Sequence, residues 1–216
     1  MLEDRDISDA FIWKAFAMRL LRRAAALAIF ALPFFAATPA AADEWMIRDY
    51  LVDQVRGWSS SPVVLLTLEA SNERYANLEQ ARIDALDKQW RAEREVEDQP
   101  LITAVLSSPL SSYLTRIQSD SQGLFSAIFV MDAVGLNAGQ SAITSDFWQG
   151  DEAKWQQTFL VAPDAVFIDE VEINEDTGTE IRQLNMSIAQ DGRVVGAITV
   201  DVNITELRRR YNAGKV

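Results

Sequence analysis

The segment TEIRQLNMSIAQDGRVVGAITVDVNI, residues 179–204, decides the fold of this chain. Apolar and polar residues alternate on both sides of the turn Gln190-Asp191-Gly192, as expected for strands that bury one face. An Asp-Gly pair between two such runs is typical of a tight hairpin turn. We therefore predict two adjacent antiparallel strands here.

Two further segments are predicted to be strands. The segment AVFIDEVEINEDTG, residues 165–178, alternates with its acids on one side and is joined to the next strand by a turn at 175–178. It makes a meander of three consecutive antiparallel strands. The segment LFSAIFVMDAVG, residues 124–135, is apolar, branched and bounded by glycine, which is typical of a buried strand.

The residues before these strands have helical periodicity. Apolar residues recur at three- and four-residue spacing over 44–58, before an interruption at Gly57 and Ser59–Ser61. Ser61 followed by Pro62 indicates a new helix start, with serine as N-cap and proline at the first position. One apolar stripe then continues through Trp90, which predicts a single long amphipathic helix that ends near Val96.

That length leaves two alternatives open for the long helix. A helix of about 30 residues is longer than a small domain, which about 20 helical residues already cross. Part of its stripe would then contact a second copy in a homodimer. Alternatively, the whole stripe packs on its own domain. After Gln99-Pro100 we expect two short helices, the second of them starting at Pro109. The predicted fold class is α+β, with the long N-terminal helix packed on a mainly antiparallel sheet.

The first 42 residues have the pattern of an export signal. From Met18 onward, three arginines precede an apolar run over 24–37 and then Ala40-Ala41-Ala42, which predicts a cleaved signal peptide with Asp43 as the first mature residue. The apolar run is shorter than the roughly 20 residues of a stable membrane span, although a retained anchor is the alternative. The acidic stretch before Met18 suits no export signal, so we expect translation to start at Met18. The predicted organisation is a signal region over 1–42, a helical region over 43–98 and a core that contains the predicted strands over 99–216.

Composition excludes several classes of function. Net charge is −12 for the whole chain, which repels nucleic acid and anionic lipid. The sequence has no cysteine and no histidine, which rules out disulfides, thiol nucleophiles, Ser-His-Asp triads and the common zinc sites. Only carboxylate, lysine, tyrosine or serine chemistry remains for an enzyme, and the acids are scattered. We expect no enzyme activity and no cofactor.

The order of the predicted elements resembles the single Cache domain, an extracytoplasmic sensor family with a PAS-like fold. The segments that carry the resemblance are IFVMDAVGLNAGQS, SDFWQGDEAKWQQTF and GRVVGAITVDVNITEL, in an order that covers the chain after residue 42. The resemblance implies a long helix on one sheet face and a small ligand cavity on the other. Most such domains continue into a transmembrane helix and a signalling module, whereas this chain stops at Val216. The resemblance therefore implies a free-standing periplasmic version that signals through another chain.

The stretch TSDFWQGDEAKWQQTF, residues 144–159, falls where the resemblance places the cavity roof. Phe147 and Trp148 are adjacent, so a regular element cannot point both inward, and we expect one of them to line the cavity. Trp155 and Phe159 are four residues apart on one helical face, which makes them core anchors or cavity walls. Lys154 is the cation of this stretch, and it could pair with an acid or hold a ligand carboxylate.

Asp201 is the first candidate contact for a ligand. In the segment AITVDVNI it shares the small and polar face of the strand, and a partly buried carboxylate requires a cation or donors. In relatives that bind amines and amino acids, an aspartate on this strand holds the ligand's ammonium group, and the resemblance transfers that role to Asp201. The alternative is a solvated residue at the strand end.

Three further residues complete the candidate site. Asp132, which follows the strand IFVM, either starts a turn or forms one rim of the cavity with Asp146 facing it. Arg182 is a second cation that could fix a ligand carboxylate. Asp132, Asp146 and Asp151 could alternatively hold a calcium ion through oxygen ligands, although their spacing is not that of an EF-hand.

These observations predict a periplasmic sensory protein that binds a small amine, amino acid or carboxylate and reports occupancy to a membrane-bound receptor. The first alternative is a ligand-free interaction protein that acts through its long helix, in which case the aromatic residues of 144–159 would be fully packed and leave no cavity. The second is a carboxylate hydrolase, which requires two acids about 5–10 Å apart in one cleft.

Overall fold

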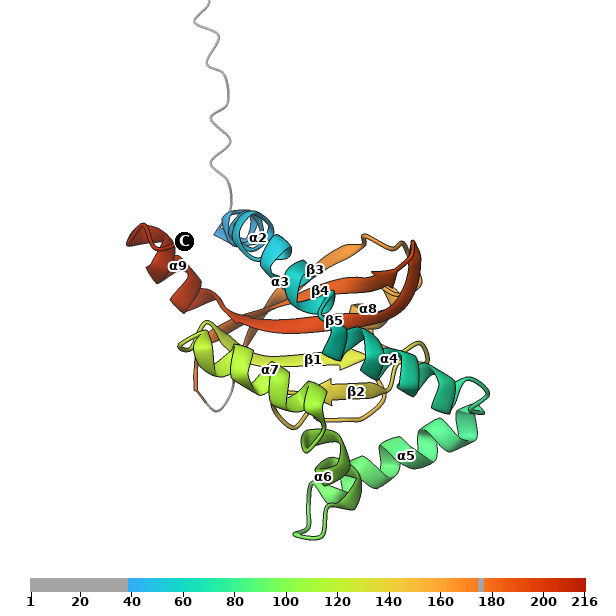
Figure 1. Cartoon of the computed structure of the whole chain (residues 1–216). Coiled ribbons are helices and arrows are strands. Elements are labelled where there is room, and N and C mark those ends of the chain that lie inside the picture. The colour runs from blue at the N-terminus through green and yellow to red at the C-terminus, as the bar shows by residue number, and fades with distance from the viewer. Residues whose placement is uncertain (1–38, 175–176) are drawn as a thin grey trace, which may run out of the picture. The chain divides into compact units, whose positions relative to one another are not determined.

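The computed structural model describes residues 39–174 and 177–216. The expected class is confirmed: the fold is α+β, with helices packed on a five-stranded antiparallel sheet (Figure 1). The described helices are α2 (Pro39–Tyr50), α3 (Val52–Ser59), α4 (Pro62–Tyr75), α5 (Gln80–Glu93), α6 (Pro100–Leu106), α7 (Pro109–Asp120), α8 (Ala153–Gln156) and α9 (Ile204–Asn212). The strands are β1 (Phe125–Met131), β2 (Asn137–Gln140), β3 (Val166–Ile173), β4 (Glu180–Gln190) and β5 (Arg193–Asn203).

The strand order is β2-β1-β5-β4-β3, so the last strand of the chain is the centre of the sheet. The predicted hairpin joins β4 to β5 through Asp191 and Gly192, whose φ angles of 52° and 76° are those of a tight two-residue turn. All four predicted strands are present. Strand β2 was not predicted, because only the four residues 137–140 form it, too few to show a period.

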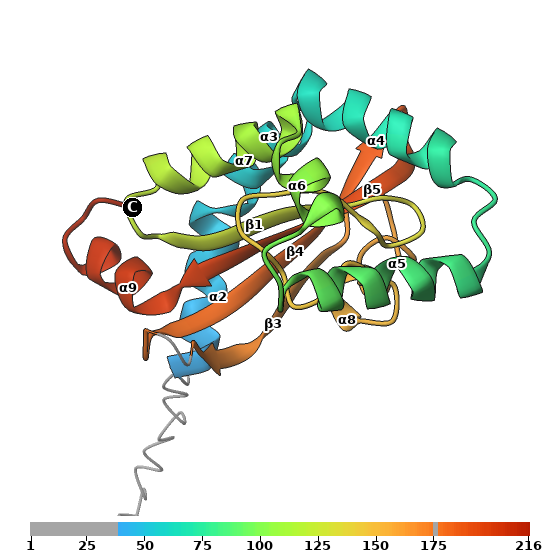
Figure 2. The ribbon, with the colours of Figure 1, turned by 90° about the horizontal axis from the view of Figure 1, so that it is seen from below.

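One face of the sheet carries the main hydrophobic core. Alternate residues of the strands, such as Val130, Leu184 and Val200, are fully buried there. They pack against apolar residues of α3, α4 and α7, and Figure 2 shows these three helices together on one side of the sheet. This face has the pattern that the alternation in β4 and β5 predicted.

The expected long helix is divided, which corrects that prediction. Helix α4 starts at Pro62 as predicted but ends at Tyr75, and α5 starts at Gln80 after Glu79 adopts an extended backbone with ψ of 148°. Asn77 lies in the break, and asparagine favours turns over helix interiors because its side chain competes for backbone hydrogen bonds.

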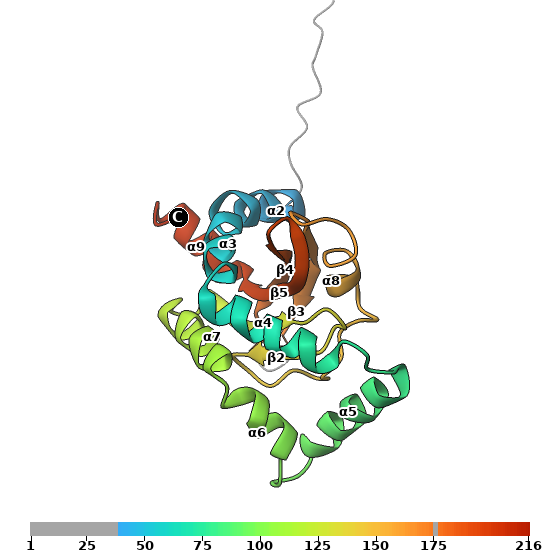
Figure 3. The ribbon, with the colours of Figure 1, turned by 45° about the vertical axis from the view of Figure 1, so that its right-hand side comes forward.

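The two halves also bury their stripes in different places. Leu68 of α4 joins the main core, whereas Leu86 and Trp90 of α5 join a separate cluster with residues of α6 and of the segment around Phe147. Leu68 and Leu86 are about five helical turns apart, so the stripe stays in phase and conceals the break. Figure 3 shows α5 turned back beside α6.

The predicted signal peptide lies outside the described residues apart from its last four, which belong to α2. Asp43, the predicted first residue of the mature chain, is buried and accepts two hydrogen bonds from Arg208 of α9, at 2.8 and 2.7 Å. This ion pair ties α2 to the C-terminal helix. Among the described residues, no helix has both the length and the apolar content of a membrane span.

Candidate functional site

A small cavity lies against the sheet face opposite the main core. Its volume is about 210 Å³, and it lies between the sheet, the segment 142–149 and α8, partly open to solvent. The lining residues are Ala127, Phe129, Ala142, Ile143, Thr144, Ser145, Gln149, Lys154, Gln183 and Asp201. The place is the one that the resemblance implied, with the segment between β2 and β3 as roof.

The sheet register brings the polar floor together. Asp201 of the central strand lies opposite Ala127 of β1 on one side and Gln183 of β4 on the other. The next row on the same face places Thr199 beside Asn185, and Thr199 Oγ1 donates a 2.7 Å hydrogen bond to Asn185 Oδ1. The same strands that present apolar side chains to the helices therefore present hydrogen-bonding groups to the cavity.

Asp201 is the carboxylate of the cavity. Gln183 Nε2 donates to its Oδ1 at 3.0 Å, and no hydrogen bond within the described part of the chain reaches its Oδ2. Burial raises the pKa of Asp201 to about 6, while the charge of Lys154 and the Gln183 hydrogen bond offset part of that shift. A carboxylate that is costly to ionise and has an oxygen to spare is suited to bind a cation.

Lys154 supplies the positive charge of the cavity. It comes from α8, its ammonium nitrogen lies 2.8 Å from Glu152 Oε2, and its side chain is only 14% exposed. The same nitrogen lies 5.5 Å from the centre of the Phe129 ring, which is within range of a cation–π interaction. The cavity thus has a carboxylate on its floor and an ammonium group from α8.

Gln149 is a roof residue that the sequence interpretation did not identify. It is 1% exposed, and its Nε2 donates to Asp146 Oδ1 at 2.5 Å and to Asp146 O at 3.2 Å. Its Oε1 is buried and accepts no hydrogen bond from the residues that the structure describes. An unpaired buried acceptor is costly, so a cavity-lining carbonyl of this kind favours a ligand that donates an N–H or O–H group.

The predicted aromatic lip has a different role. Phe147 stacks on Trp90 of α5 with ring centres 5.2 Å apart, and Trp148 Nε1 donates to Val134 O at 2.8 Å. Trp155 stacks on Phe159 at 4.7 Å and donates to Asp132 O. None of these rings is among the residues that line the cavity. The core-anchor interpretation of Trp155 and Phe159 describes their packing.

Asp132 is fully buried and serves the turn after β1. Its Oδ1 accepts the N–H groups of Val134 and Leu136 at 3.0 and 2.9 Å, and its Oδ2 accepts the Ser71 hydroxyl at 2.8 Å. Burial raises the pKa of Asp132, and these hydrogen bonds, which lower the pKa, offset only part of the rise. With its oxygens engaged and its side chain away from the cavity lining, Asp132 has the turn-forming role that was the alternative to a rim contact.

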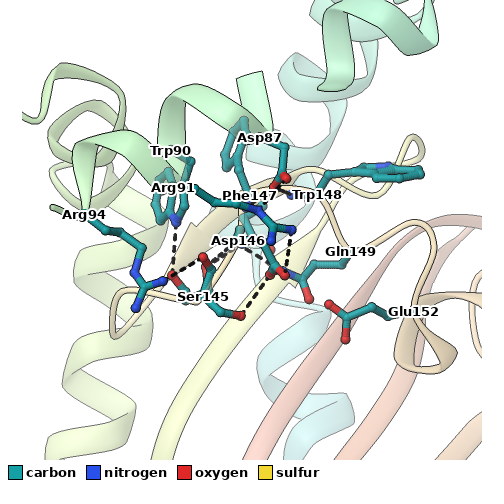
Figure 4. Close-up of polar contacts among 12 residues, drawn as sticks. Asp87, Trp90, Arg91, Arg94, Ser145, Asp146, Phe147, Trp148, Gln149 and Glu152 are labelled. Carbon is teal, nitrogen blue, oxygen red and sulfur yellow. Dashed lines mark hydrogen bonds and ion pairs between the residues drawn. The ribbon is translucent and has the colours of Figure 1, made fainter. Parts of the chain in front are cut away.

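Asp146 and Arg182 also lie outside the cavity lining. Asp146 lies behind the roof, where it binds Gln149 and lies 3.4 Å from Arg91 Nη2 (Figure 4). Arg182 is next to Gln183 in β4, so it projects from the opposite sheet face, where its Nε donates to Asp169 O at 2.6 Å. The expectation that it would hold a ligand carboxylate in the cavity is therefore wrong.

Two alternative chemistries lack the required geometry. In the described ranges no three acidic side chains come together as metal ligands, so Asp132, Asp146 and Asp151 do not form the calcium site considered above. Of the residues that line the cavity, Asp201 is the one carboxylate, whereas hydrolysis between two acids needs a pair.

Comparison with known proteins gives matches in solved structures. The ligand-binding domain of the Campylobacter jejuni chemoreceptor Tlp3, in complex with 4-methylisoleucine, is 13% identical with a TM-score of 0.37 over 71% of this chain and 65% of that chain. The ligand-binding domain of the Pseudomonas aeruginosa amino acid chemoreceptor PctC, in complex with GABA, is 15% identical with a TM-score of 0.34 over 69% of this chain and 64% of that chain.

A third match is the sensor domain of the V. cholerae histidine kinase DctB, which is 12% identical with a TM-score of 0.35 over 67% of this chain and 59% of that chain. This chain thus spans between 59% and 65% of the three solved chains. Two of these solved chains are described as ligand-binding domains and the third as a sensor domain. No family model and no curated protein matches the chain.

Proposed function

We propose that this protein binds a small molecule with a protonated amine in the cavity, and that a free amino acid fits best. The observation that carries the proposal is the incompletely paired carboxylate of Asp201 on the cavity floor. An ammonium group there gains an ion pair in a place that water solvates poorly. The unpaired Oε1 of Gln149 offers a second acceptor for the same group.

The other lining groups support the choice of an amino acid. Lys154 provides a cation for a ligand carboxylate, in competition with Glu152. A cavity of about 210 Å³ is smaller than the roughly 300–1,000 Å³ of sites for drug-sized ligands, which favours a small ligand such as an amino acid.

The test is a melting-temperature screen of the chain from Asp43 to Val216. The panel contains the twenty L-amino acids, GABA, small amines and small carboxylates. A ligand at 100 times its dissociation constant adds about 2.7 kcal/mol, which is a shift of several degrees. We expect an amino acid to stabilise the parent protein and not the Asp201→Asn variant. The proposal is wrong if no compound shifts the parent, or if the variant responds equally.

The proposal includes a sensory role in the periplasm. The basic, apolar and small residues before Asp43 support export, and a ligand site without a catalytic pair supports a protein that reports occupancy to a membrane-bound receptor. Cell fractionation and N-terminal sequencing of the recovered protein test the first part: a periplasmic product that begins at Asp43 is expected, and a cytoplasmic product that begins at Met18 contradicts it.

The competing interpretation, an interaction protein without a ligand, predicted packed aromatics and no cavity. Phe147, Trp148 and Trp155 do form packed contacts, but the cavity lies beside them and is lined by polar groups. The long helix through which such an interaction protein would act is also divided into α4 and α5. We therefore prefer the ligand-binding proposal, and homodimerisation stays a prediction.

A further inference from the structure

Helix α5 lies outside the cavity but binds the backbone of its roof. Asp87 Oδ1 accepts the N–H groups of Phe147 and Trp148, at 2.8 and 3.1 Å (Figure 4). A carboxylate that accepts two backbone N–H groups makes a strong, charge-assisted contact. Without Asp87 these two N–H groups would need other acceptors.

A side chain of α5 and the side chain of its C-cap residue continue this contact toward the cavity. Trp90 Nε1 donates to Thr144 O at 3.0 Å, and Arg94 Nη1 donates to Ser145 O at 3.0 Å. Thr144 and Ser145 both line the cavity. Side chains of α5 and its C-cap residue therefore bind the roof segment 144–148 along its length, mostly through hydrogen bonds to its backbone.

A third connection reaches the unpaired acceptor of the roof. Arg91 Nε lies 2.8 Å from Asp87 Oδ2, and Arg91 Nη2 lies 3.4 Å from Asp146 Oδ2. The other oxygen of Asp146 accepts Gln149 Nε2, which leaves Gln149 Oε1 unpaired at the cavity wall. The orientation of Gln149 is thus linked to α5 through Asp146.

The roof and α5 share a core that is separate from the main one. Their apolar side chains, Trp90 and Phe147 among them, form a cluster distinct from the core that α3, α4 and α7 make with the sheet. Helix α5 is braced by α6, because Glu93 Oε2 accepts the N–H groups of Leu101 and Ile102 at 2.8 and 2.9 Å. The contacts between the roof and α5 are therefore separate from the packing of the main core.

We infer that α5 holds the cavity roof in position, and that Asp87 is the positioning residue that fixes the roof above the cavity floor. Loss of this hold exposes the partly open cavity further and frees the orientation of Gln149. This inference rests on the proposed function in taking the cavity as the binding site. Access to the cavity can nevertheless be measured without any ligand.

The experiment uses the absence of cysteine from the sequence. Ala127→Cys places a single thiol on the cavity floor of the full-length protein, and the rate of its reaction with a small methanethiosulfonate reagent reports access. We expect Asp87→Ala, added to the Ala127→Cys protein, to raise the reaction rate at least threefold. Asp87→Asn keeps an acceptor oxygen, so the rate with this variant should stay close to that of Ala127→Cys alone. The matched control is Asp84→Ala, because Asp84 is on the same helix and, within the described ranges, its side chain binds the exposed Gln80 and no residue of the roof.

A second thiol separates loss of the hold on the roof from general loosening. Val130→Cys lies on the main-core face of β1, where Val130 is fully buried. The inference is overturned if Asp87→Ala changes the Ala127→Cys rate less than threefold, or if it accelerates Val130→Cys by the same factor. If the melting-temperature screen finds no ligand, the proposed function fails, while these rates still decide whether α5 controls access.

Discussion

The two faces of the sheet are made by the same strands and differ in what they bury. Toward α3, α4 and α7, strands β1, β4 and β5 present Val130, Leu184 and Val200, all fully buried and apolar. Toward the cavity, the neighbouring positions in β4 and β5 present Asn185, Thr199 and Asp201. The first face gains stability from burial, whereas the second keeps polar groups that each need a partner. The second face is the one to which the proposed function assigns the ligand.

The largest effect is expected on the apolar face. Leu184→Ala should cost about 2–5 kcal/mol of unfolding free energy, because it leaves a cavity in a packed core. Urea denaturation of the variant and the parent measures this. A loss below about 1 kcal/mol would mean that the helix face is not the main source of stability.

The next effect has the opposite sign and tests the cavity face. Burial raises the pKa of Asp201 from its usual 3.8 to about 6, so its ionisation costs stability as pH rises from about 4 to 6. Asp201→Asn removes this cost and should stabilise the ligand-free protein at pH 7.5 by on the order of 1–3 kcal/mol. The gain should become small near pH 4 and vanish below about pH 3, where the carboxyl group is protonated in both the folded and unfolded states. Denaturation at both pH values checks it, and a destabilised variant at pH 7.5 contradicts it.

The polar pair in the next row should give a smaller loss. Thr199→Val removes the hydroxyl that donates to Asn185 Oδ1, and both side chains are fully buried. The expected cost is about 1–2 kcal/mol, mainly because Asn185 is left without its donor. The double variant Thr199→Val with Asn185→Leu should recover part of this loss in the same denaturation assay. No recovery would mean that packing, and not the unpaired amide, causes the cost.

The smallest effect concerns a carboxylate outside the sheet. Hydrogen bonds from Arg209 and Arg210 lower the pKa of Glu206 to about 2, the reverse of the shift at Asp201. Its stabilisation is therefore present above the usual pKa of 4.5 and is lost as pH falls toward 2. Because Arg209 is 61% exposed and the ion pairs lie at the protein surface, where solvent screens them, Glu206→Gln should cost only about 0.5 kcal/mol at pH 7 and less below pH 4. Urea denaturation at both pH values measures this cost. If the stability lost in Glu206→Gln grows as pH falls, the pKa of Glu206 is not lowered in the folded protein.

Local patterns predicted much of the architecture. The alternation of β4 and β5 and the Asp-Gly turn between them were sufficient to predict the hairpin, because period and turn chemistry act over a few residues. The same alternation put Asp201 on a polar strand face, and it lines the cavity. The starts of α4 and α7 were also predicted correctly from a serine followed by proline.

Other features depended on contacts between distant segments. The stripe through Leu68 and Leu86 stays in phase across the break after Tyr75, so periodicity could not show that α5 turns back. That return directs Phe147 onto Trp90 and away from the cavity. Arg182 was assigned to the cavity because nothing in the sequence states that its neighbour Gln183 is the residue opposite Asp201.

The sequence by itself determined the strands, the central hairpin, the absence of thiol and imidazole chemistry, and the position of the key carboxylate, since these follow from periodicity and composition. Only the tertiary structure decided which side chains enclose the cavity, that Gln149 presents an unpaired oxygen, and that α5 holds the roof. The physical reason is that a strand's alternation fixes its own two faces. Strand register and helix direction decide which distant groups meet across them.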